Sequence, residues 1–328
     1  MNFNKSNRFV MTMTLAALTV LCINPLSAQT AWPKKGSSVQ LWIGYAAGSG
    51  TDAGARLMAA GLEKELGVTI VPMNKPGASS QIMYTALAGA KGDGYVFGTI
   101  NFPSAIISYI DPDRKAVYTK KNFSLLALHI IDPGIIAVLP DSPYKTLGDL
   151  IAAAKANPKT VTITTSGIQS DEHFALLQLE EMTGAKFAFV HFSTGAASAM
   201  APFMGGKIDA YTGNVADVLA QHKAGQVRIL GVMDSERTRF YPDVPTFEEQ
   251  GFKLYNSANR GFAVPAGTPK AIVNKLSAAM KKVMDSPEHQ KLVEDMGLTL
   301  RYLSPEQYSK FWDEYADNVK RLLPLSKE

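Results

Sequence analysis

The sequence has 328 residues and a nearly even balance of charge, with 33 Lys or Arg residues against 29 Asp or Glu. This balance, without any basic tract, is not the pattern of a nucleic-acid-binding protein. The single cysteine, Cys22, lies in the N-terminal leader, so the chain beyond it has no thiol for a disulfide, a nucleophile or a metal ligand.

Residues 1–28 have the pattern of a secretory signal peptide. Lys5 and Arg8 precede a mostly apolar run from Phe9 to Ile23, and Ala28 offers a small residue for cleavage. The run is too short for a membrane span, which needs about 20 residues. We expect cleavage near Ala28 and export to the periplasm. Loss of the two basic residues leaves a mature chain with 31 basic and 29 acidic side chains.

The stretch from Val39 to Leu66 predicts a strand, a small-residue turn and a helix. The strand is an apolar run that ends at Ile43, and Thr51 or Asp52 is suited to cap the helix. The first amide groups of such a helix have no partner within it and favour an anion. Two alternatives stay open here: a cradle for a phosphate or carboxylate, or a tight connection that binds nothing.

Strands and helices continue to alternate, which favours an α/β fold with mostly parallel sheets. About 300 residues favour two domains. The apolar run Leu125–Leu139, interrupted at 132–134, predicts a strand that passes between them. We expect lobe 1 to hold residues 33–128 and 256–328, and lobe 2 residues 129–255. The expected later strands are 68–71, 95–100, 161–164, 187–192, 208–211, 227–232 and 259–264, and the main helices are 81–90, 147–156, 172–183, 271–284, 287–296 and 305–322.

Four expected strand-to-helix junctions are rich in small or hydroxyl-bearing residues: Gly48–Asp52, Gly77–Gln81, Ser166–Asp171 and Ser193–Ser198. The carboxyl ends of strands in an open α/β sheet lie on one side, so that junctions of one sheet can converge. Two such sets, one from each lobe, predict a cleft that binds an anion mainly through neutral donors.

Motifs for enzymatic chemistry are weaker. The sequence has no Walker pattern and no G-x-S-x-G motif, and its five histidines include no i, i+4 pair that would indicate zinc on a helix. Ser166 or Ser170 with His173 leaves a secreted α/β hydrolase as an alternative. A binding protein that feeds a sensor is a second alternative. We expect no enzymatic activity, no cofactor and no metal.

A series of motifs runs in order through nearly the whole chain beyond the leader. They are Ala47–Asp52 with Ala55–Leu57, Asn74–Ala78, Gly92–Tyr95, Ser166–Gly167 with Ser170 and His173, Gly205–Asp209, Tyr241–Thr246 and Pro265–Pro269. Together they resemble the Bug receptors, the periplasmic substrate-binding proteins of tripartite tricarboxylate transporters. The resemblance implies a two-lobed periplasmic-binding-protein (Venus flytrap) fold that captures a small organic mono- or dicarboxylate. It also implies a monomer that delivers this ligand to membrane transporter subunits.

The resemblance further implies which residues contact the ligand. Those of lobe 1 are Ala47, Gly48, Ser49, Thr51, Asp52, Ala78 and Ser79, and those of lobe 2 are Ser166, Ile168, Ser170, Thr194, Gly195 and Asn214. The chain departs from the family pattern at Ser193–Gly195 and at Ile168, so the identity of the carboxylate stays open.

Three apolar residues lie at or beside expected strand ends, where their side chains could contact the part of the ligand between its polar ends: Phe102, Ile168 and Phe192. Burial of an apolar ligand surface against them contributes roughly 25 cal/mol per Å². We therefore expect a ligand that has an apolar or aromatic body with one or two carboxylates, and not citrate or another hydroxyl-rich acid. The alternative is that Phe102 and Phe192 point into the cores of their lobes.

Overall fold

The computed structural model describes residues 32–192 and 196–327, and the expected signal peptide lies outside them. Residues 33–328 form one compact unit. Its strands are β1 (Ser38–Ile43), β2 (Thr69–Asn74), β3 (Val96–Phe102), β4 (Phe123–Val138), β5 (Thr162–Thr165), β6 (Ala188–His191), β7 (Tyr211–Asn214), β8 (Arg228–Val232), β9 (Ser257–Pro265) and β10 (Thr299–Leu303).

The helices fill most of the intervals between these strands. They are α1 (Gly50–Leu66), α2 (Gln81–Ala88), α3 (Ser104–Ile110), α4 (Leu147–Ala156), α5 (Asp171–Thr183), α6 (Ala196–Met204), α7 (Leu219–Lys223), α8 (Lys270–Met284), α9 (Pro287–Asp295) and α10 (Pro305–Leu322). Short 3-10 turns cover Pro112–Arg114, Lys120–Asn122, Val215–Val218 and Pro324–Lys327. Within the part of the chain that the structure describes, every helix is too short or too polar to cross a membrane.

The main sheet is mixed, with the strand order β10-β4-β9-β3-β1-β2. β1 pairs in parallel with β2 and β3, where the chain alternates between strands and helices. β9 runs antiparallel to both β3 and β4. β5 and β6 form a separate parallel pair. These pairings, with helices between successive strands, confirm the α/β class.

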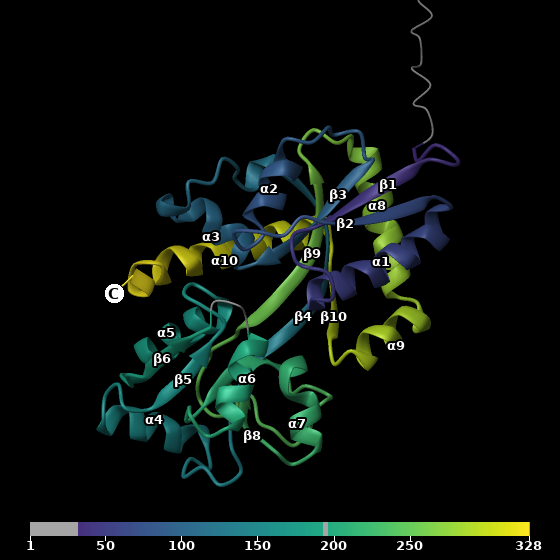
Figure 1. Ribbon diagram of the computed structural model, residues 1–328. Helices are drawn as coiled ribbons and strands as arrows, with labels where there is room; N and C mark the ends of the chain where they lie inside the picture. The colour runs from purple at the N-terminus through teal and green to yellow at the C-terminus, as the bar shows by residue number, and fades with distance from the viewer. Residues whose placement is uncertain (1–31, 193–195, 328) are drawn as a thin grey trace, which may run out of the picture. The chain divides into compact units, whose positions relative to one another are not determined.

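β4 has 16 residues and changes its partners along its length. Residues 123–133 pair with β9, whereas residues 134–138 pair with β7 and β8. Figure 1 shows β4 beside β9 as two long neighbouring strands. The interruption expected at 132–134 is therefore a change of partners within a continuous strand.

Two large groups of buried apolar side chains lie on either side of this change of partners. One contains Phe102, Tyr118 and Trp312, and packs α3 and α10 against the strands. The other contains Ile163 and Phe247, together with buried side chains of α4 and α5. Because removal of apolar surface from water drives folding, these groups fix the elements that frame the space between them.

Most helix starts follow local sequence signals. Thr146 caps α4 and Ser304 caps α10, each in a capping box with the residue three positions on. β7, however, begins at Tyr211 and not at 208. Just before it, the carboxylate of Asp209 accepts hydrogen bonds from Thr162 N–H and Oγ1 at 2.8 and 2.6 Å. β10 has no counterpart among the predicted strands.

Candidate functional site

A cavity of about 510 Å³ lies where the start of α1 meets the ends of β3, β5 and β7 and the beginning of β9. Elements from both expected lobes therefore contribute to its wall. The predicted contact residues in that wall are Ser49, Thr51, Ser79, Ser166, Ile168, Ser170 and Asn214. Thr194 and Gly195 lie outside the described residues.

The loop before α1 is organised around a buried carboxylate. Asp52 is 3% exposed, and its oxygens accept hydrogen bonds from Gly48 N–H, Arg56 Nε and Asn74 Nδ2 at 2.8–2.9 Å. Burial pushes the pKa of Asp52 up, but these hydrogen bonds outweigh it, so that the pKa is lowered. Asp52 thus shapes the loop and is not part of the cavity wall.

The cap of α1 differs from the predicted one. The structure has Ser49 at the N-cap, where its Oγ accepts a hydrogen bond from Asp52 N–H at 3.2 Å, and neither Thr51 nor Asp52 fills that place. Gly48 has φ +83°, and a Cβ built on it would meet no atom within 4 Å. A side chain at Gly48 would therefore strain the backbone, and the space beside it is open; Gly48 is not among the residues that line the cavity.

The second junction contains three successive residues with positive φ: Ala78, Ser79 and Ser80. Left-handed conformations of this kind cost a non-glycine residue roughly 1–2 kcal/mol. Ser80 Oγ donates to Gly44 O at 2.9 Å and ties the turn to the end of β1. The turn places Ser79 in the cavity wall, whereas Ala78 is outside it.

The junction after β5 uses its serines in local hydrogen bonds. Ser166 Oγ donates to Glu172 Oε2 at 2.5 Å, and Ser170 Oγ caps α5 by accepting from His173 N–H at 3.2 Å. His173 Nδ1 accepts from Gln169 N–H at 3.0 Å. Over the described ranges, no hydrogen bond joins either serine hydroxyl to the imidazole, so the pair that a hydrolase would need is not formed.

The most prominent side chain that the sequence prediction missed is Arg260 of β9. Its side chain is 16% exposed and lies in the cavity wall, with Nη2 at 3.7 Å from the carboxylate of Asp132 in β4. Nη1 is buried and has no hydrogen-bond partner among the described residues. A single arginine directly before the apolar or small run from Gly261 to Val264 is the signal that could have revealed it.

Carboxyl groups surround the lobe 2 side of the same cavity: Asp171 and Glu172 at the start of α5, and Asp217 after β7. Burial, and then the neighbouring Glu172, raises the pKa of Asp171 well above its usual range. Burial likewise raises the pKa of Asp217 and brings the pKa of Asp132 to about 7. The described residues contain no group of three or more His, Cys, Asp and Glu side chains arranged to hold a metal ion.

The apolar residues expected at the ligand's body separate into two kinds. Phe102 is 3% exposed and packs against Tyr308 and Trp312, and Phe192 packs on a core cluster of the β7–β8 region. Ile168 is 61% exposed and lines the cavity. Both phenylalanine side chains thus pack in the cores, but Phe102 also borders the cavity, as Ile168 does, whereas Phe192 does not.

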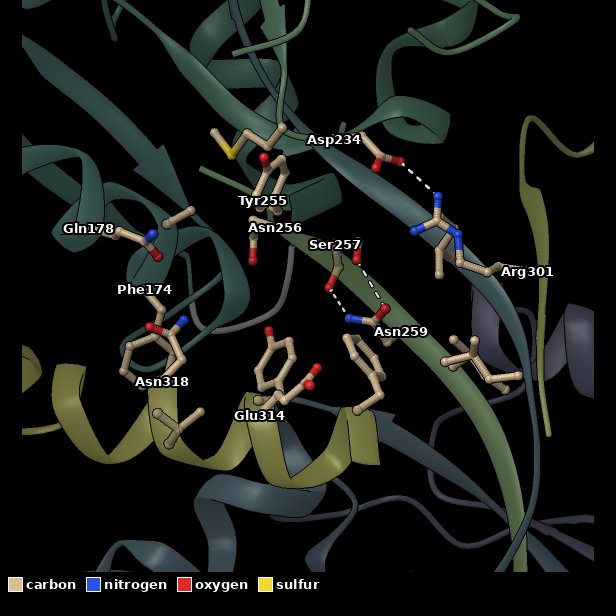
Figure 2. Close-up of a pocket in the computed structure, with 18 of the residues that line it drawn as sticks. Phe174, Gln178, Asp234, Tyr255, Asn256, Ser257, Asn259, Arg301, Glu314 and Asn318 are labelled. Atoms are coloured by element: carbon tan, nitrogen blue, oxygen red, sulfur yellow. Dashed lines mark hydrogen bonds and ion pairs between the residues drawn. The ribbon is translucent and has the colours of Figure 1, made fainter. Parts of the chain in front are cut away.

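A second cavity of about 480 Å³ is shown in Figure 2. Ser257 and Asn259 of β9 line it, joined by hydrogen bonds of 3.0 and 2.7 Å, whereas Ala258 and Arg260 line the first cavity. Since successive side chains of a strand point to opposite faces, β9 forms a partition between the two spaces. The second cavity contains none of the predicted contact residues.

Comparison with known proteins identifies the family. The family model TctC, described as tripartite tricarboxylate transporter family receptor, matches residues 54–327. A UPF0065 protein of Agrobacterium vitis is 31% identical over 83% of this chain and 79% of its own length. Protein BugT of Bordetella pertussis is 27% identical over 93% of this chain and 92% of its own.

Solved structures share the fold. A TctC solute-binding protein from Polaromonas has a TM-score of 0.79 and 29% identity, covering 89% of this chain and 99% of its own. MatC from Rhodopseudomonas palustris, solved with bound malate, has a TM-score of 0.72 and 24% identity, covering 87% and 98%. These likenesses confirm the two-lobed binding-protein fold, and the chain belongs to the TctC family of tripartite tricarboxylate transporter receptors, which includes the Bug periplasmic solute-binding proteins.

Proposed function

We propose that the protein, exported to the periplasm, captures a small organic carboxylate in the 510 Å³ cavity and delivers it to a tripartite transporter without chemical turnover. The family match supports the class of protein. One observation carries the proposal: a Cβ built on Gly50, the first residue of α1, would lie 3.5 Å from Arg260 Nη2. A helix N-terminus and a guanidinium therefore adjoin the same space, and both favour a carboxylate.

The proposed contacts are the predicted residues that line this space, together with Arg260 and Asn101 from the neighbouring strands. Ser49, Thr51, Ser79, Ser166 and Ser170 offer hydroxyl groups at the ends of their elements. Asn214 holds the wall through a hydrogen bond from its Nδ2 to Asp132 O at 2.7 Å. Ala47, Gly48, Asp52 and Ala78 shape the two lobe 1 turns. A role for Thr194 and Gly195 stays a prediction.

Isothermal titration calorimetry of the mature chain tests the capture of a carboxylate. We expect saturable binding of at least one acid from a set of malate, succinate, an aromatic dicarboxylate and citrate. Arg260→Gln removes a charge-assisted hydrogen bond, typically about 1.5–3 kcal/mol, so affinity falls by roughly 10-fold to 100-fold. Arg239→Gln, which changes an exposed arginine paired with Glu294, serves as the control.

The outcomes of that titration separate the alternatives. Unchanged affinity in Arg260→Gln would place the carboxylate elsewhere. Hydrolysis of an ester or amide by the purified protein, lost in Ser166→Ala or Ser170→Ala, would favour the hydrolase instead. A ranking with citrate tightest would refute an apolar ligand body, which now depends on Phe102 and Ile168 in the cavity wall.

A further inference from the structure

The cavity of Figure 2 takes its wall from both expected lobes. Strand β10 and helix α10 of lobe 1 contribute Leu303 and Asn318, and helix α5 of lobe 2 contributes Gln178. Figure 2 shows Gln178 and Asn318 at the same space, with Ser257 and Asn259 of β9 beside it. The cavity therefore spans the connection between the two parts of the chain and is not internal to either of them.

The wall includes the point where the chain crosses between the lobes. Met233 and Asn256 line the cavity, and both hold Gly134, where β4 changes its partners. Gly134 N–H donates to Asn256 O at 2.8 Å, and Met233 N–H donates to Gly134 O at 2.8 Å. Asn256 N–H donates in turn to Met233 O at 2.9 Å. A molecule in this cavity would thus contact the residues that connect the lobes.

The charged side chains in this wall are already paired with one another. Arg301 Nη2 lies 3.5 Å from Asp234 Oδ2, and Lys310 Nζ lies 3.5 Å from Glu314 Oε1. An ion in the cavity would therefore meet no unpaired opposite charge among the described residues of the wall, and burial of an unpaired charge is costly. An uncharged molecule avoids that cost.

Much of the wall is apolar, which makes water a poor occupant. Leu128 and Ile131 of β4 are each 1% exposed, and Phe174 and Phe311 add aromatic rings. A buried water needs about two to four polar partners, which these side chains cannot offer. An apolar body gains by removing such surface from water, and an aromatic one can also stack on the rings. The volume of about 480 Å³ falls within the roughly 300–1,000 Å³ of small-molecule sites.

We propose that the cavity behind β9 is a second binding site, for a small uncharged molecule with an aromatic body and a hydroxyl or carbonyl group, and that its occupant favours closure of the first cavity. The half-buried amides of Gln178 and Asn318 can bond the polar group of this molecule.

The effect on the first cavity follows from the position of β9. The two spaces lie on opposite faces of this strand, so a rotation of the lobes that narrows one space widens the other. An occupant that holds the second space wide therefore favours a narrow first space and tighter carboxylate binding. The second site itself goes beyond the proposed function, and only its effect on carboxylate binding rests on that function.

Calorimetry of the mature chain with 2-naphthol at pH 7 tests the site without any carboxylate. The probe has an aromatic body and a hydroxyl group that stays protonated at this pH, as that of tyrosine does. We expect saturable binding of one molecule per chain. Protonated 2-(aminomethyl)naphthalene has the same rings and a positive charge, so it should bind at least about 10-fold more weakly. Absence of saturable 2-naphthol binding, or equal or tighter binding of the charged probe, would overturn the site.

Gln178→Trp tests whether the probe binds in this cavity. The larger side chain occupies part of the space, so we expect the affinity for 2-naphthol to fall about 10-fold or more. Met182→Trp, at a 43% exposed position of the same helix outside the wall, is the matched control and keeps the affinity. Circular dichroism checks that each variant is folded, and Asn318→Trp, which enters the space from α10, replaces Gln178→Trp if that variant is unfolded. Unchanged 2-naphthol affinity in the folded variant would overturn the proposal.

The effect on the first cavity is measured with the carboxylate that binds most tightly in the titration described above. Saturating 2-naphthol should tighten its binding about 5-fold or more in the wild type and in Met182→Trp, but not in Gln178→Trp. Unchanged or weaker carboxylate binding in the presence of bound 2-naphthol would overturn the effect on closure. If 2-naphthol binds and no carboxylate does, the proposed function fails and the second site stands.

Discussion

Asp132 lies where β4 changes its partners, and its carboxyl group is 2% exposed. Ala216 N–H donates to its Oδ1 at 3.2 Å, Arg260 Nη2 lies 3.7 Å from its Oδ2, and the Asp217 carboxylate is a nearby like charge. Burial, as the largest influence, raises its pKa to about 7 despite the attraction of Arg260. This residue is therefore half-protonated near neutral pH in the folded protein.

The raised pKa of Asp132 predicts the direction of a pH effect. An unfolded aspartate titrates near ~4, so between pH ~4 and 7 the folded state binds more protons than the unfolded state. The contribution of Asp132 to the free energy of unfolding is thus full below pH ~4 and falls as the pH rises, by up to about 1.4 kcal/mol per pH unit.

Urea unfolding of the wild type and of Asp132→Asn over pH 4–8 measures this effect. We expect the wild-type stability, relative to the variant, to fall as the pH rises through that range. The comparison is made at each pH because the buried histidines, whose pKa values burial lowers, act in the opposite direction. Asp141→Asn is the exposed control. A difference in stability that does not vary with pH would contradict a raised pKa for Asp132.

At the scale of elements, α1 has a glycine in the left-handed region at each end. Gly48, with φ +83°, lies in the loop before the helix, and Gly67, with φ +66°, is its C-cap. A Cβ on either would meet no atom within 4 Å, so substitution strains the backbone without a steric clash. The two positions therefore form a matched pair that separates stability from binding.

Gly48→Ala and Gly67→Ala should each lower the free energy of unfolding by about 1 kcal/mol, measured by urea titration. Ligand affinity, measured by calorimetry, should fall only in Gly48→Ala, because Gly48 N–H helps to hold the loop through Asp52. The decrease should be smaller than that in Arg260→Gln. Loss of all binding in Gly48→Ala would instead support direct contact between the ligand and this backbone.

Elements whose causes are local could be predicted from the sequence. The bounds of α4 and the start of α10 follow from Thr146 and Ser304, whose capping partners lie three residues away. β10 could not be predicted because its pairing with β4 joins segments far apart in the chain. The same holds for Arg260, since its contact with Asp132 depends on the pairing of β9 with β4.

The same distinction between local and long-range causes applies to the residues of the candidate site. Seven predicted contact residues line the cavity because they lie at strand-to-helix junctions, where local pattern shows small and hydroxyl-bearing residues. The roles of Asp52 and Gly48 could not be predicted from the sequence. Only the fold shows that Arg56, Asn74 and Gly48 donate hydrogen bonds to the Asp52 carboxylate. Asn101 and Asp171 likewise could not be singled out from the sequence, because only the structure shows that Asn101 Oδ1 and Asp171 Oδ2 are buried without a hydrogen-bond partner among the described residues.

At the scale of the whole molecule, a division into residues 33–128 with 256–328 and residues 129–255 stays our proposal for the two lobes. Strands β4 and β9 connect the parts, and the cavity takes residues from each. Capture by closure of the lobes and transfer to a membrane partner are then properties of the intact chain, which we expect to be a monomer.

Delivery is tested in cells that lack the gene. Uptake of a radiolabelled ligand identified by calorimetry should be restored by the wild-type protein and not by Arg260→Gln, because loss of capture removes the supply to the transporter. Arg239→Gln should restore uptake and is the control. If uptake is normal without the gene while a transcriptional response to the ligand is lost, the protein serves a sensor and delivery is contradicted.

The partition made by β9 has a thermodynamic consequence. The backbone that carries Arg260 toward one cavity carries Ser257 and Asn259 toward the other, so occupancy of either acts on the same nine residues. Linkage requires that any molecule in the cavity of Figure 2 that changes carboxylate affinity by some factor has its own affinity changed by that same factor. By this reciprocity, a molecule that weakens carboxylate binding is itself bound less tightly when the carboxylate is present.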